Sequence, residues 1–536
     1  MAAPTTLERV SSVGKEPTVA SHSEKLGTGP SQTVEELDSF IQQEAAKCPA
    51  FYKCPNLLKL YLLMASGCLL PAVTLGFDSS MMNGLQAVPA WDTYFNSPRG
   101  SILGITTAIL GLGAITTTPL LSPIGDRFGR RWAIFLGTII MIIGGVLQGA
   151  SVHIGMFIAS RFIIGLGLVF ANTFAPVLIG ELAHPKHRHV ATSLYQTSYY
   201  LGAILAAWTT FGTFRIESNW SWRIPSYLQA APALVQACCI WFVPESPRFL
   251  IAKSRPEEAR AILVKYHAEG DEDSEFVNAE FRQMRAVIEA EVANKTTWKT
   301  MIATPGNRRR VMVLVMLGIF SQWSGNGLVS YYIARILETV GITDASDKNI
   351  INGCLNIWNW ITAVASAIIS GRLKRRTHFI VSTVGMFVVF SIQTLCAGLF
   401  NERGNKTAGH VVIAMLFLFY PFFNFAFNAL LYSYPVEILP YPIRAKGFSV
   451  LMIFNKGGVF LNVFVNPIGL QNLGWKYYGV YVGWLLVEIF CVWKFFPETS
   501  GHSLEAIAAA IDGKTAVDNE RAIDQRIPED MKDRKE

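Results

Sequence analysis

Apolar runs of about 20 residues recur along most of the chain and alternate with short polar segments. A helix needs about 20 apolar residues to cross roughly 30 Å of hydrocarbon, so each run predicts one membrane span. The pattern predicts twelve spans, which start near residues 57, 103, 132, 156, 193, 223, 311, 350, 379, 410, 446 and 475. We therefore expect an all-α integral membrane protein that crosses the bilayer many times.

Composition and charge agree with this prediction. The chain is 51% hydrophobic and 16% charged, whereas soluble proteins carry about 25% charged residues. Its net charge of +7 does not indicate a nucleic-acid partner, because no basic patch is interleaved with aromatic residues in a soluble segment. The basic residues gather in loops on one side, which the positive-inside rule assigns to the cytoplasm. They are Arg127, Arg130, Arg131, Lys186, Arg188, Arg372, Lys374, Arg375, Arg376, Arg444 and Lys446. An even number of spans then places both termini in the cytoplasm.

Missing motifs exclude several classes of function. The chain has no Gly-x-x-x-x-Gly-Lys-Ser/Thr loop, so we expect no nucleotide cofactor and no transport driven by ATP. No nucleophile, base and orienting residue gather in a soluble segment, so we do not expect an enzyme. Six of the eight cysteines lie in predicted spans and Cys48 and Cys54 in the inner tail, which predicts neither disulfides nor a metal site. Asn219 and Asn405 begin sequons in short outer loops, and their glycosylation stays open.

Polar and charged segments divide the chain into five predicted parts. These are a cytoplasmic N-terminal tail (1–56), a six-helix half (57–244), a cytoplasmic helical linker (245–310), a second six-helix half (311–497) and a cytoplasmic C-terminal tail (498–536). No secretory signal precedes the first span, so we expect that span itself to direct insertion into the membrane.

Three motifs recur between the two halves. Asp126-Arg-Phe-Gly-Arg-Arg131 is echoed by Gly371-Arg-Leu-Lys-Arg-Arg376, Glu181 and Arg188 by Glu437 and Arg444, and Pro244-Glu-Ser-Pro-Arg248 by Pro497-Glu-Thr-Ser-Gly501. The three offsets of 245, 256 and 253 residues are nearly equal, which indicates a duplicated six-span half. Parallel halves of this kind are typical of major facilitator transporters, which bind their substrate between the halves near the middle of the membrane.

These motifs resemble those of the sugar porter family within the major facilitator superfamily, over nearly all of residues 57–505. Arg161 with Gly165 and Gly167 and the segment from Gln322 to Tyr332 also match. Within the family, the pieces QWSGNGLVSYY and FNKGGVFLNVFVNP look most like the fungal lactose-permease branch. The resemblance implies the major facilitator fold with 12 transmembrane helices in two six-helix halves, and transport by alternating access.

Two opposite charges stand inside the apolar runs, Asp78 in the first and Arg161 in the fourth. An unpaired charge at membrane depth is costly, so we expect these side chains to pair. The pair could be a static contact that only fixes helix packing. Sugar porters that use protons resemble this chain in having an aspartate at the position of Asp78. The resemblance therefore implies that Asp78 accepts the proton and that Arg161 regulates it.

Carboxylates and arginines stand together at the inner ends of the helices. The expected cytoplasmic gate comprises Asp126, Arg127, Arg130, Glu181, Arg188, Glu245, Arg375, Glu437, Arg444 and Glu498. Opposite charges there can join the halves while the inner gate is closed. They could instead be orientation signals, but the recurrence of glutamate with arginine at a fixed spacing favours a gate. Because Gly371 and Lys374 depart from the family's loop motif, we expect the second copy to contribute less.

The family's sugar-contacting positions fall on six polar residues of this chain. They are Gln196, Gln322, Asn326, Asn359, Tyr432 and Asn455. Amides suit a hydroxyl-rich ligand because they donate and accept hydrogen bonds without adding charge, although any one of them could instead join two helices. Gln322 and Asn326 are four residues apart, so we expect them to share a helix face.

Two further features bear on the solute. The chain departs from the family at Ser321, Gly327, Tyr432 and Asn428-Ala429, which predicts a roomier site than a hexose site. Lys456 directly follows Asn455 in the eleventh span, and Glu488 lies in the twelfth. We expect Lys456 and Glu488 to form a structural salt bridge, while an acidic substrate that contacts Lys456 stays open.

The sequence thus predicts a proton-coupled symporter that imports a sugar, either a disaccharide such as lactose or a hexose, across the plasma membrane. The alternatives are a passive uniporter, a carrier of a sugar acid or polyol, and a non-transporting nutrient sensor, for which we would expect longer tails. The expected partners are the sugar, protons and the lipid bilayer. A monomer suffices for this function.

Overall fold

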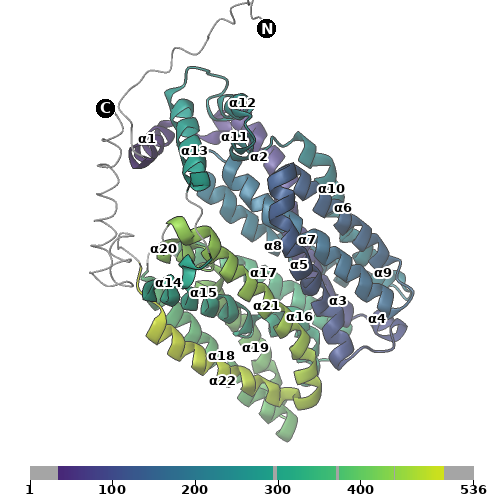
Figure 1. Cartoon of the computed structure of the whole chain (residues 1–536). Helices are drawn as coiled ribbons and strands as arrows, with labels where there is room; N and C mark the ends of the chain where they lie inside the picture. The colour runs from purple at the N-terminus through teal and green to yellow at the C-terminus, as the bar shows by residue number, and fades with distance from the viewer. Residues whose placement is uncertain (1–33, 294–297, 370–372, 440, 500–536) are drawn as a thin grey trace, which may run out of the picture.

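The structure is a computed structural model, and it describes residues 34–293, 298–369, 373–439 and 441–499. Its regular elements in these ranges are all helices, which gather into two bundles (Figure 1). Most of both predicted tails lies outside the described residues, as do Gly371, Arg372 and Gly501 of the repeated motifs.

The first bundle contains six membrane-crossing helices, two of which are broken into two segments. Its elements are α2 (Pro55–Cys68) with α3 (Leu70–Gln86), α5 (Gly100–Phe128), α6 (Arg130–Gly149), α7 (Ile154–Leu182), α8 (Arg188–Thr213), and α9 (Trp220–Leu228) with α10 (Ala230–Cys239) and the short η2 (Ile240–Phe242). A short outer helix, α4 (Pro89–Tyr94), follows α3. The break between α2 and α3 precedes Pro71, whose missing N–H interrupts the helical hydrogen bonds.

The second bundle repeats this arrangement. Its elements are α15 (Pro305–Trp323) with α16 (Asn326–Thr339), α17 (Ala345–Ile369), α18 (Arg375–Arg403), α19 (Lys406–Phe423) with the π-helical turn η3 (Asn424–Asn428) and α20 (Ser433–Ile438), α21 (Tyr441–Leu473), and α22 (Tyr477–Phe495) after η4 (Gly474–Lys476). The twelve predicted spans are therefore all present in the described residues. Most begin a few residues before the predicted starts, because polar residues at the ends of the spans continue the helix beyond the hydrocarbon.

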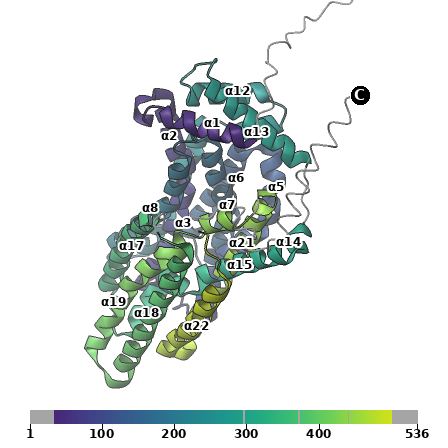
Figure 2. The ribbon, with the colours of Figure 1, turned by 90° about the vertical axis from the view of Figure 1, so that its left-hand side faces the viewer.

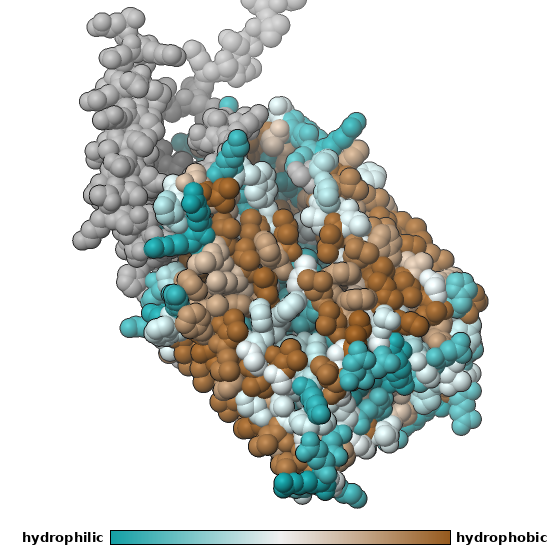
Figure 3. All heavy atoms as spheres, turned by 60° about the horizontal axis from the view of Figure 1, so that its bottom comes forward, coloured by the Kyte–Doolittle hydropathy of each residue, from teal (hydrophilic) through white to brown (hydrophobic). Residues whose placement is uncertain are grey.

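Eight stretches are long and apolar enough to count as membrane spans by length and composition, and the last of them, Lys446–Phe495, contains two helices. Hydrophobic side chains accordingly cover much of the face drawn in Figure 3. α8 and α17 are not among the eight, and both are interrupted by polar side chains. These two helices pack against each other across the halves, so their polar residues face protein as well as lipid.

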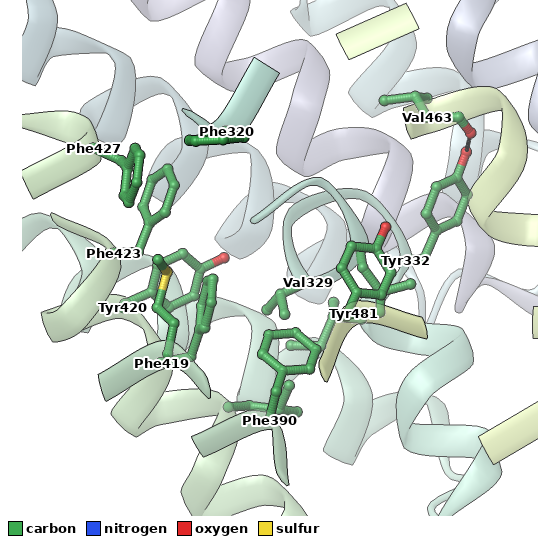
Figure 4. Close-up of a cluster of buried hydrophobic side chains, with 14 of the residues drawn as sticks. Phe320, Val329, Tyr332, Phe390, Phe419, Tyr420, Phe423, Phe427, Val463 and Tyr481 are labelled. Carbon is green, nitrogen blue, oxygen red and sulfur yellow. Dashed lines mark hydrogen bonds between the residues drawn. The ribbon is translucent and has the colours of Figure 1, made fainter. Parts of the chain in front are cut away.

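Three pairs of helices make most of the contacts between the halves: α5 with α21, α8 with α17, and α3 with α16. The α5–α21 contact is close enough to need glycine, since a Cβ added at Gly104 would lie 2.6 Å from the Phe464 carbonyl oxygen. Inside the second bundle, aromatic side chains such as Phe390, Phe419 and Tyr481 form a continuous buried cluster (Figure 4). α15 and α16 pack against the other helices of the second half, and α16 also contacts α3 of the first half.

A small helical layer covers the inner end of the first bundle. It consists of α1 (Val34–Lys47), η1 (Phe51–Lys53), α11 (Pro247–Ala252), α12 (Pro256–His267) and α13 (Glu275–Ala293), with α14 (Thr300–Ala303) leading to the second bundle. Figures 1 and 2 both show α1, α12 and α13 together at one end of the molecule. Ile41 of α1 packs there on Leu263 and Val277 in a separate buried cluster.

The linker also holds the start of the first span. The Glu269 carboxylate accepts hydrogen bonds from the backbone N–H groups of Asn56 and Leu57, each at 3.0 Å. A carboxylate at a helix N-terminus satisfies free N–H donors and favours the helix dipole. The inner end of α2 is thereby fixed to the loop between α12 and α13.

A buried ion pair fastens the layer to the bundle. His267 Nδ1 lies 2.7 Å from Glu280 Oε2, its Nε2 lies 3.1 Å from the Leu182 carbonyl oxygen, and Arg188 approaches Glu280 at 3.6 Å. Burial disfavours the charged imidazole, but Glu280 outweighs it and holds the pKa of His267 above 6.5. Burial likewise opposes ionisation of Glu280, yet His267 holds the pKa of Glu280 below 4.5. Nearby His184 stays neutral, since burial and His267 lower its pKa to about 3.

We expect the attachment of this layer to depend on pH. The charged His267 contributes fully below its ordinary pKa of 6.5, and this contribution is lost as pH rises through its raised folded pKa. The contribution of Glu280 is present above 4.5 and is lost as pH falls through its lowered folded pKa. Hydrogen exchange, corrected for intrinsic rates, should show protection of α12 and α13 falling as pH is raised above neutrality. Glu280→Gln should lower protection and flatten this dependence, whereas the exposed Glu275→Gln on the same helix should not. A pH-independent protection in the unmodified protein would contradict the prediction.

Candidate functional site

The two intramembrane charges predicted to pair do so, with matched geometry. Arg161 Nη1 donates to Asp78 Oδ1 at 2.9 Å, and Nη2 donates to Oδ2 at 3.0 Å. The Asp78 side chain on α3 is 3% exposed and that of Arg161 on α7 is 1% exposed. A bidentate contact at this burial is among the strongest that a carboxylate can make. Both residues lie in the outer parts of their helices, as the chain direction predicts.

A third residue completes the pair, and the sequence analysis missed it. Gln229, at the junction of α9 and α10, donates from Nε2 to Asp78 Oδ1 at 2.9 Å. The carboxylate thus accepts three hydrogen bonds from two neighbouring helices. A single glutamine in an apolar run gives no sequence signal of this contact, because its partner is 151 residues away.

The residues that follow Asp78 reach the other half. Ser79 lies 3.5 Å from the Tyr331 hydroxyl, and Gln86 donates to the Tyr331 carbonyl oxygen at 3.0 Å. Asn83 donates to the Ser330 carbonyl oxygen and accepts from the Ile333 N–H at 3.3 Å. These contacts, which we call the outer seam, join α3 to the backbone of α16. An ion pair between Asp92 and Arg335 at 3.5 Å extends the seam to the outer loops.

The seventh span is broken where the predicted substrate residues lie. α15 ends at Trp323, Gly325 adopts a left-handed φ of +104°, and α16 begins at Asn326. The prediction that Gln322 and Asn326 share the face of one helix is therefore wrong. The spacing argument assumed an unbroken helix, and the left-handed turn, which glycine permits, changes the direction of the chain between them.

The predicted asparagines are held by protein partners. Asn359 on α17 accepts from Asn424 Nδ2 at 2.8 Å, and Asn428 donates to Asn424 Oδ1 at 3.0 Å. Asn428 also donates to the Tyr200 hydroxyl at 2.6 Å, which carries this amide chain from the second half to α8. The sequence analysis named Asn359 alone. Nothing in the sequence shows that the π-helical turn η3 brings Asn424 to Asn359 and Asn428 to Asn424.

The remaining predicted positions form two small groups. Asn455 on α21 donates to Ser321 Oγ of α15 at 2.9 Å, which is a hydrogen bond between two helices, the alternative to a role in sugar binding. Asn326 accepts from Ser330 Oγ at 3.0 Å within α16. Gln196 lies beside the hydroxyl of Tyr432, whose side chain is 37% exposed. Gln322 is half-buried next to Gly458. These side chains lie on α8 of the first half, on α15, α16 and α21 of the second half, and at Tyr432 directly before α20.

The expected salt bridge between Lys456 and Glu488 is not formed, so that prediction is wrong. The Glu488 side chain on α22 is completely buried beside Trp484, and neither carboxylate oxygen has a hydrogen-bond partner among the described residues. Trp484 packs on Trp323 of the same half at 5.4 Å between ring centroids. Lys456 is exposed. The two charges are separated because Glu488 points into its own bundle.

The charged residues of the motif at the inner end of the first half contact one another. Arg130 Nε lies 3.4 Å from Glu181 Oε2, and Glu245 accepts from the backbone N–H groups of Arg130 and Arg131 at 3.2 and 3.3 Å. Glu245 thereby caps the N-terminus of α6. Gly129 precedes it with a φ of +94°, and a Cβ there would come within 2.5 Å of Glu245 Oε2.

The second half reproduces this motif. Arg375 Nη2 lies 2.8 Å from Glu437 Oε1, and Glu498 accepts from the N–H groups of Arg375 and Arg376 at 2.8 and 3.1 Å. Lys374 stands in the second half where the first half has Gly129. The φ of Lys374 is −64°, so the chain turns into α18 without a residue in the left-handed conformation. The contacts described for these gate residues join helices of one half.

The other predicted gate residues lie at the same inner end. Arg444 donates to the Leu439 carbonyl oxygen at 3.3 Å, and the Arg127 guanidinium lies 5.5 Å from the ring centroid of Phe128. Asp126 is exposed at the end of α5. Arg188 contacts Glu280 of the linker, which the sequence analysis did not anticipate. Among the described residues, no group of three histidine, cysteine, aspartate or glutamate side chains is arranged to hold a metal ion.

Comparison with known proteins gives a consistent result. A family model described as "Sugar (and other) transporter" matches residues 64–511. The chain is 30% identical to hexose transporter 2 of Kluyveromyces lactis over 413 residues, which cover 75% of this chain and 73% of that protein. It is 26% identical to the high-affinity glucose transporter of Kluyveromyces lactis over 479 residues, covering 85% and 86%. The inward open structure of the xylose transporter XylE from E. coli has a similar fold, with a TM-score of 0.69, 21% identity and coverage of 85% of this chain and 99% of XylE.

Removing one partner of the buried pair should destabilise the protein strongly. Arg161→Met leaves the Asp78 carboxylate buried without its cation, which we expect to cost about 3 to 5 kcal/mol. The double variant Asp78→Leu/Arg161→Met should recover much of this loss, because no charge then stays buried. Thermal unfolding of the detergent-solubilised protein measures both, with the exposed Arg403→Met as control. Equal loss in the single and double variants would mean that charge pairing does not set the stability here.

Proposed function

This chain belongs to the family of sugar (and other) transporters, and on that premise we propose that it is a symporter that imports a sugar or sugar-like solute together with protons. The family and the twelve-helix major facilitator fold predicted from the sequence are confirmed. The family is one of membrane carriers and not of enzymes. The observation that carries the proposal is the buried Asp78–Arg161 pair with its third partner, Gln229.

Asp78 is proposed as the group that takes up and releases the proton. In the structure its carboxylate accepts hydrogen bonds from Arg161 and Gln229. Protonation would remove the anion that Arg161 holds and weaken the pair. Ser79 and Asn83, which follow on the same helix, contact α16 of the other half, so a change at Asp78 can reach the outer seam.

The two ends of the molecule support alternating access. At the outer end, Asn83 and Gln86 bind the backbone of α16, so the halves are joined there. At the inner end, Arg130 pairs with Glu181 and Arg375 with Glu437, each within one half. We propose that the solute enters from the outer side after this seam opens. The break at Gly325 gives α16 freedom to move apart from α15.

The proposed solute is rich in hydroxyl groups. Gln196, Gln322 and Tyr432 stand at the contact between the halves with exposed or half-buried polar groups that donate and accept. The amide chain through Asn359 holds the surrounding helices in place and leaves fewer groups for ligand than the sequence predicted. We further propose that the site is in the plasma membrane, with α1, α12 and α13 on the cytoplasmic side together with the basic loops.

Asp78→Asn tests the proton assignment in energised cells. Accumulation of solute against its gradient should vanish while downhill exchange persists, because the variant keeps a hydrogen-bonding group but cannot ionise. Surface expression and the exposed Asp347→Asn serve as controls. Intact accumulation by Asp78→Asn would rule the assignment out. Proton uptake that accompanies solute entry into lightly buffered cells identifies the unmodified protein as a symporter, whereas a passive uniporter shows none.

Weakening the outer seam should favour the outward-facing state. In a background without native cysteines, Asn83→Ala/Gln86→Ala should increase labelling of a cysteine placed at Ser330 by a membrane-impermeant thiol reagent from outside. Asn349→Ala is the matched control, since that buried amide binds the carbonyl oxygen of Ala345 in its own helix. Unchanged labelling in the double variant would show that these amides do not hold the outer end closed.

A further inference from the structure

Lys456 stands at the depth where a transporter of this fold binds its solute. It is fifteen residues after the start of α21 at Tyr441 and seventeen before its end at Leu473. A helix rises 1.5 Å per residue, so the ammonium begins near the middle of a long membrane helix. Neither end is close enough for the lysine side chain to reach the polar headgroups by extending along the helix.

The lysine faces the protein interior between the halves. Exposed apolar residues recur along one side of α21 at Phe454, Leu461 and Val465, and we expect this side to face lipid. Lys456 follows Phe454 by two positions, which turns it by about 200° to the opposite side. Phe460, one turn further along the side of Lys456, lies against Gly111 of α5 in the first half. Lys456 is nevertheless exposed, so it borders open space next to that contact.

Lys456 has no anionic partner in the described part of the chain. No ion pair or hydrogen bond joins it to a described residue. The two carboxylates inside the apolar runs are engaged or enclosed elsewhere: Asp78 holds Arg161 and Gln229, and Glu488 is buried beside Trp484. An ionisable side chain at this depth is costly to keep unless it serves a solute or an ion.

The neighbours of Lys456 suit the rest of a sugar. Asn455 precedes it and binds Ser321 of α15, and Gly458 follows it against the side chain of Gln322. Amides that donate and accept therefore stand beside a cation that only donates. This combination fits a molecule with hydroxyl groups at one end and a carboxylate at the other. A neutral sugar would leave the ammonium without a counterion.

We propose that the solute is a sugar acid, or a polyhydroxylated acid of similar size, and that Lys456 binds its carboxylate. The inference rests on the proposed function and names the solute class of the same site. Lys456 is a specificity-determining residue in this proposal, whereas Asp78 serves the proton. A charge-assisted hydrogen bond from the ammonium to the carboxylate distinguishes the acid from its neutral twin.

Matched pairs of labelled solutes test the proposal in cells that lack their own sugar carriers. The pairs are galacturonate with galactose, gluconate with glucitol, and lactobionate with lactose. At least one acid should enter in preference to its neutral twin. Lys456→Gln should reduce that preference by about tenfold or more, the loss expected for a hydrogen bond to a charged group. Lys456→Arg should retain it, and Lys494→Gln, which removes an exposed charge at the inner end of α22, should leave it unchanged.

The outcomes separate this inference from the proposed function. Preferential entry of neutral sugars by the unmodified protein, without competition from acids, overturns the sugar-acid proposal and leaves sugar import in place. Lys456→Gln could instead lose acid and neutral uptake equally, with a normal surface level and a normal unfolding temperature. That result assigns Lys456 a structural role and overturns the proposal that it binds the carboxylate of the solute. Entry of no pair member by the unmodified protein overturns both proposals. Because the first comparison uses the unmodified protein, the test does not depend on the folding of a variant.

Discussion

The rest of the molecule depends on one interaction, the buried contact of Asp78 with Arg161. Each charge alone would be expensive inside a membrane, so the two helices that carry them are bound to each other, and Gln229 adds a third helix. The contact also lies directly before the residues that reach the other half. Ser79 and Asn83 contact α16 of the second half, and Asp78 directly precedes Ser79 in the same helix. The titratable carboxylate of Asp78 therefore lies close to the junction between the halves. A carboxylate in this position can link its protonation to the movement of α16.

The structure is asymmetric along the membrane normal. The outer seam is made of side chains of α3 that bind backbone atoms of α16, and a broken helix offers such atoms more readily than an intact one. At the inner end the charges are used within each half, where Glu245 and Glu498 cap helices and Glu181 and Glu437 bind arginines. These contacts of the two motif copies stabilise each half, while the outer seam and the Asp92–Arg335 ion pair join one half to the other. This division suits a carrier whose halves move as bodies.

The linker layer makes contacts with the first half in addition to those among the membrane helices. Glu269 caps the first span and Glu280 binds both His267 and Arg188, so the segment between the halves is bound to the first half at two places. Because the first span carries Asp78, the linker is attached to the same helix that we propose to take up the proton. Because Glu280 holds the pKa of His267 above its ordinary value, this attachment depends on pH.

The sequence by itself determined the membrane class, the twelve spans, the duplicated halves, the family and the pairing of Asp78 with Arg161, because hydrophobic runs, repeats and buried charges have large and local free-energy signatures. Only the tertiary structure decided which polar groups meet. It brought Gln229 to Asp78, Asn424 to Asn359 and Glu280 to His267, broke the helix between Gln322 and Asn326, and separated Lys456 from Glu488. An amide or a charge can turn to either side of a helix at similar local cost, and its partner lies far away in the chain. Its contact is therefore set by how the helices pack, which no local pattern of residues specifies.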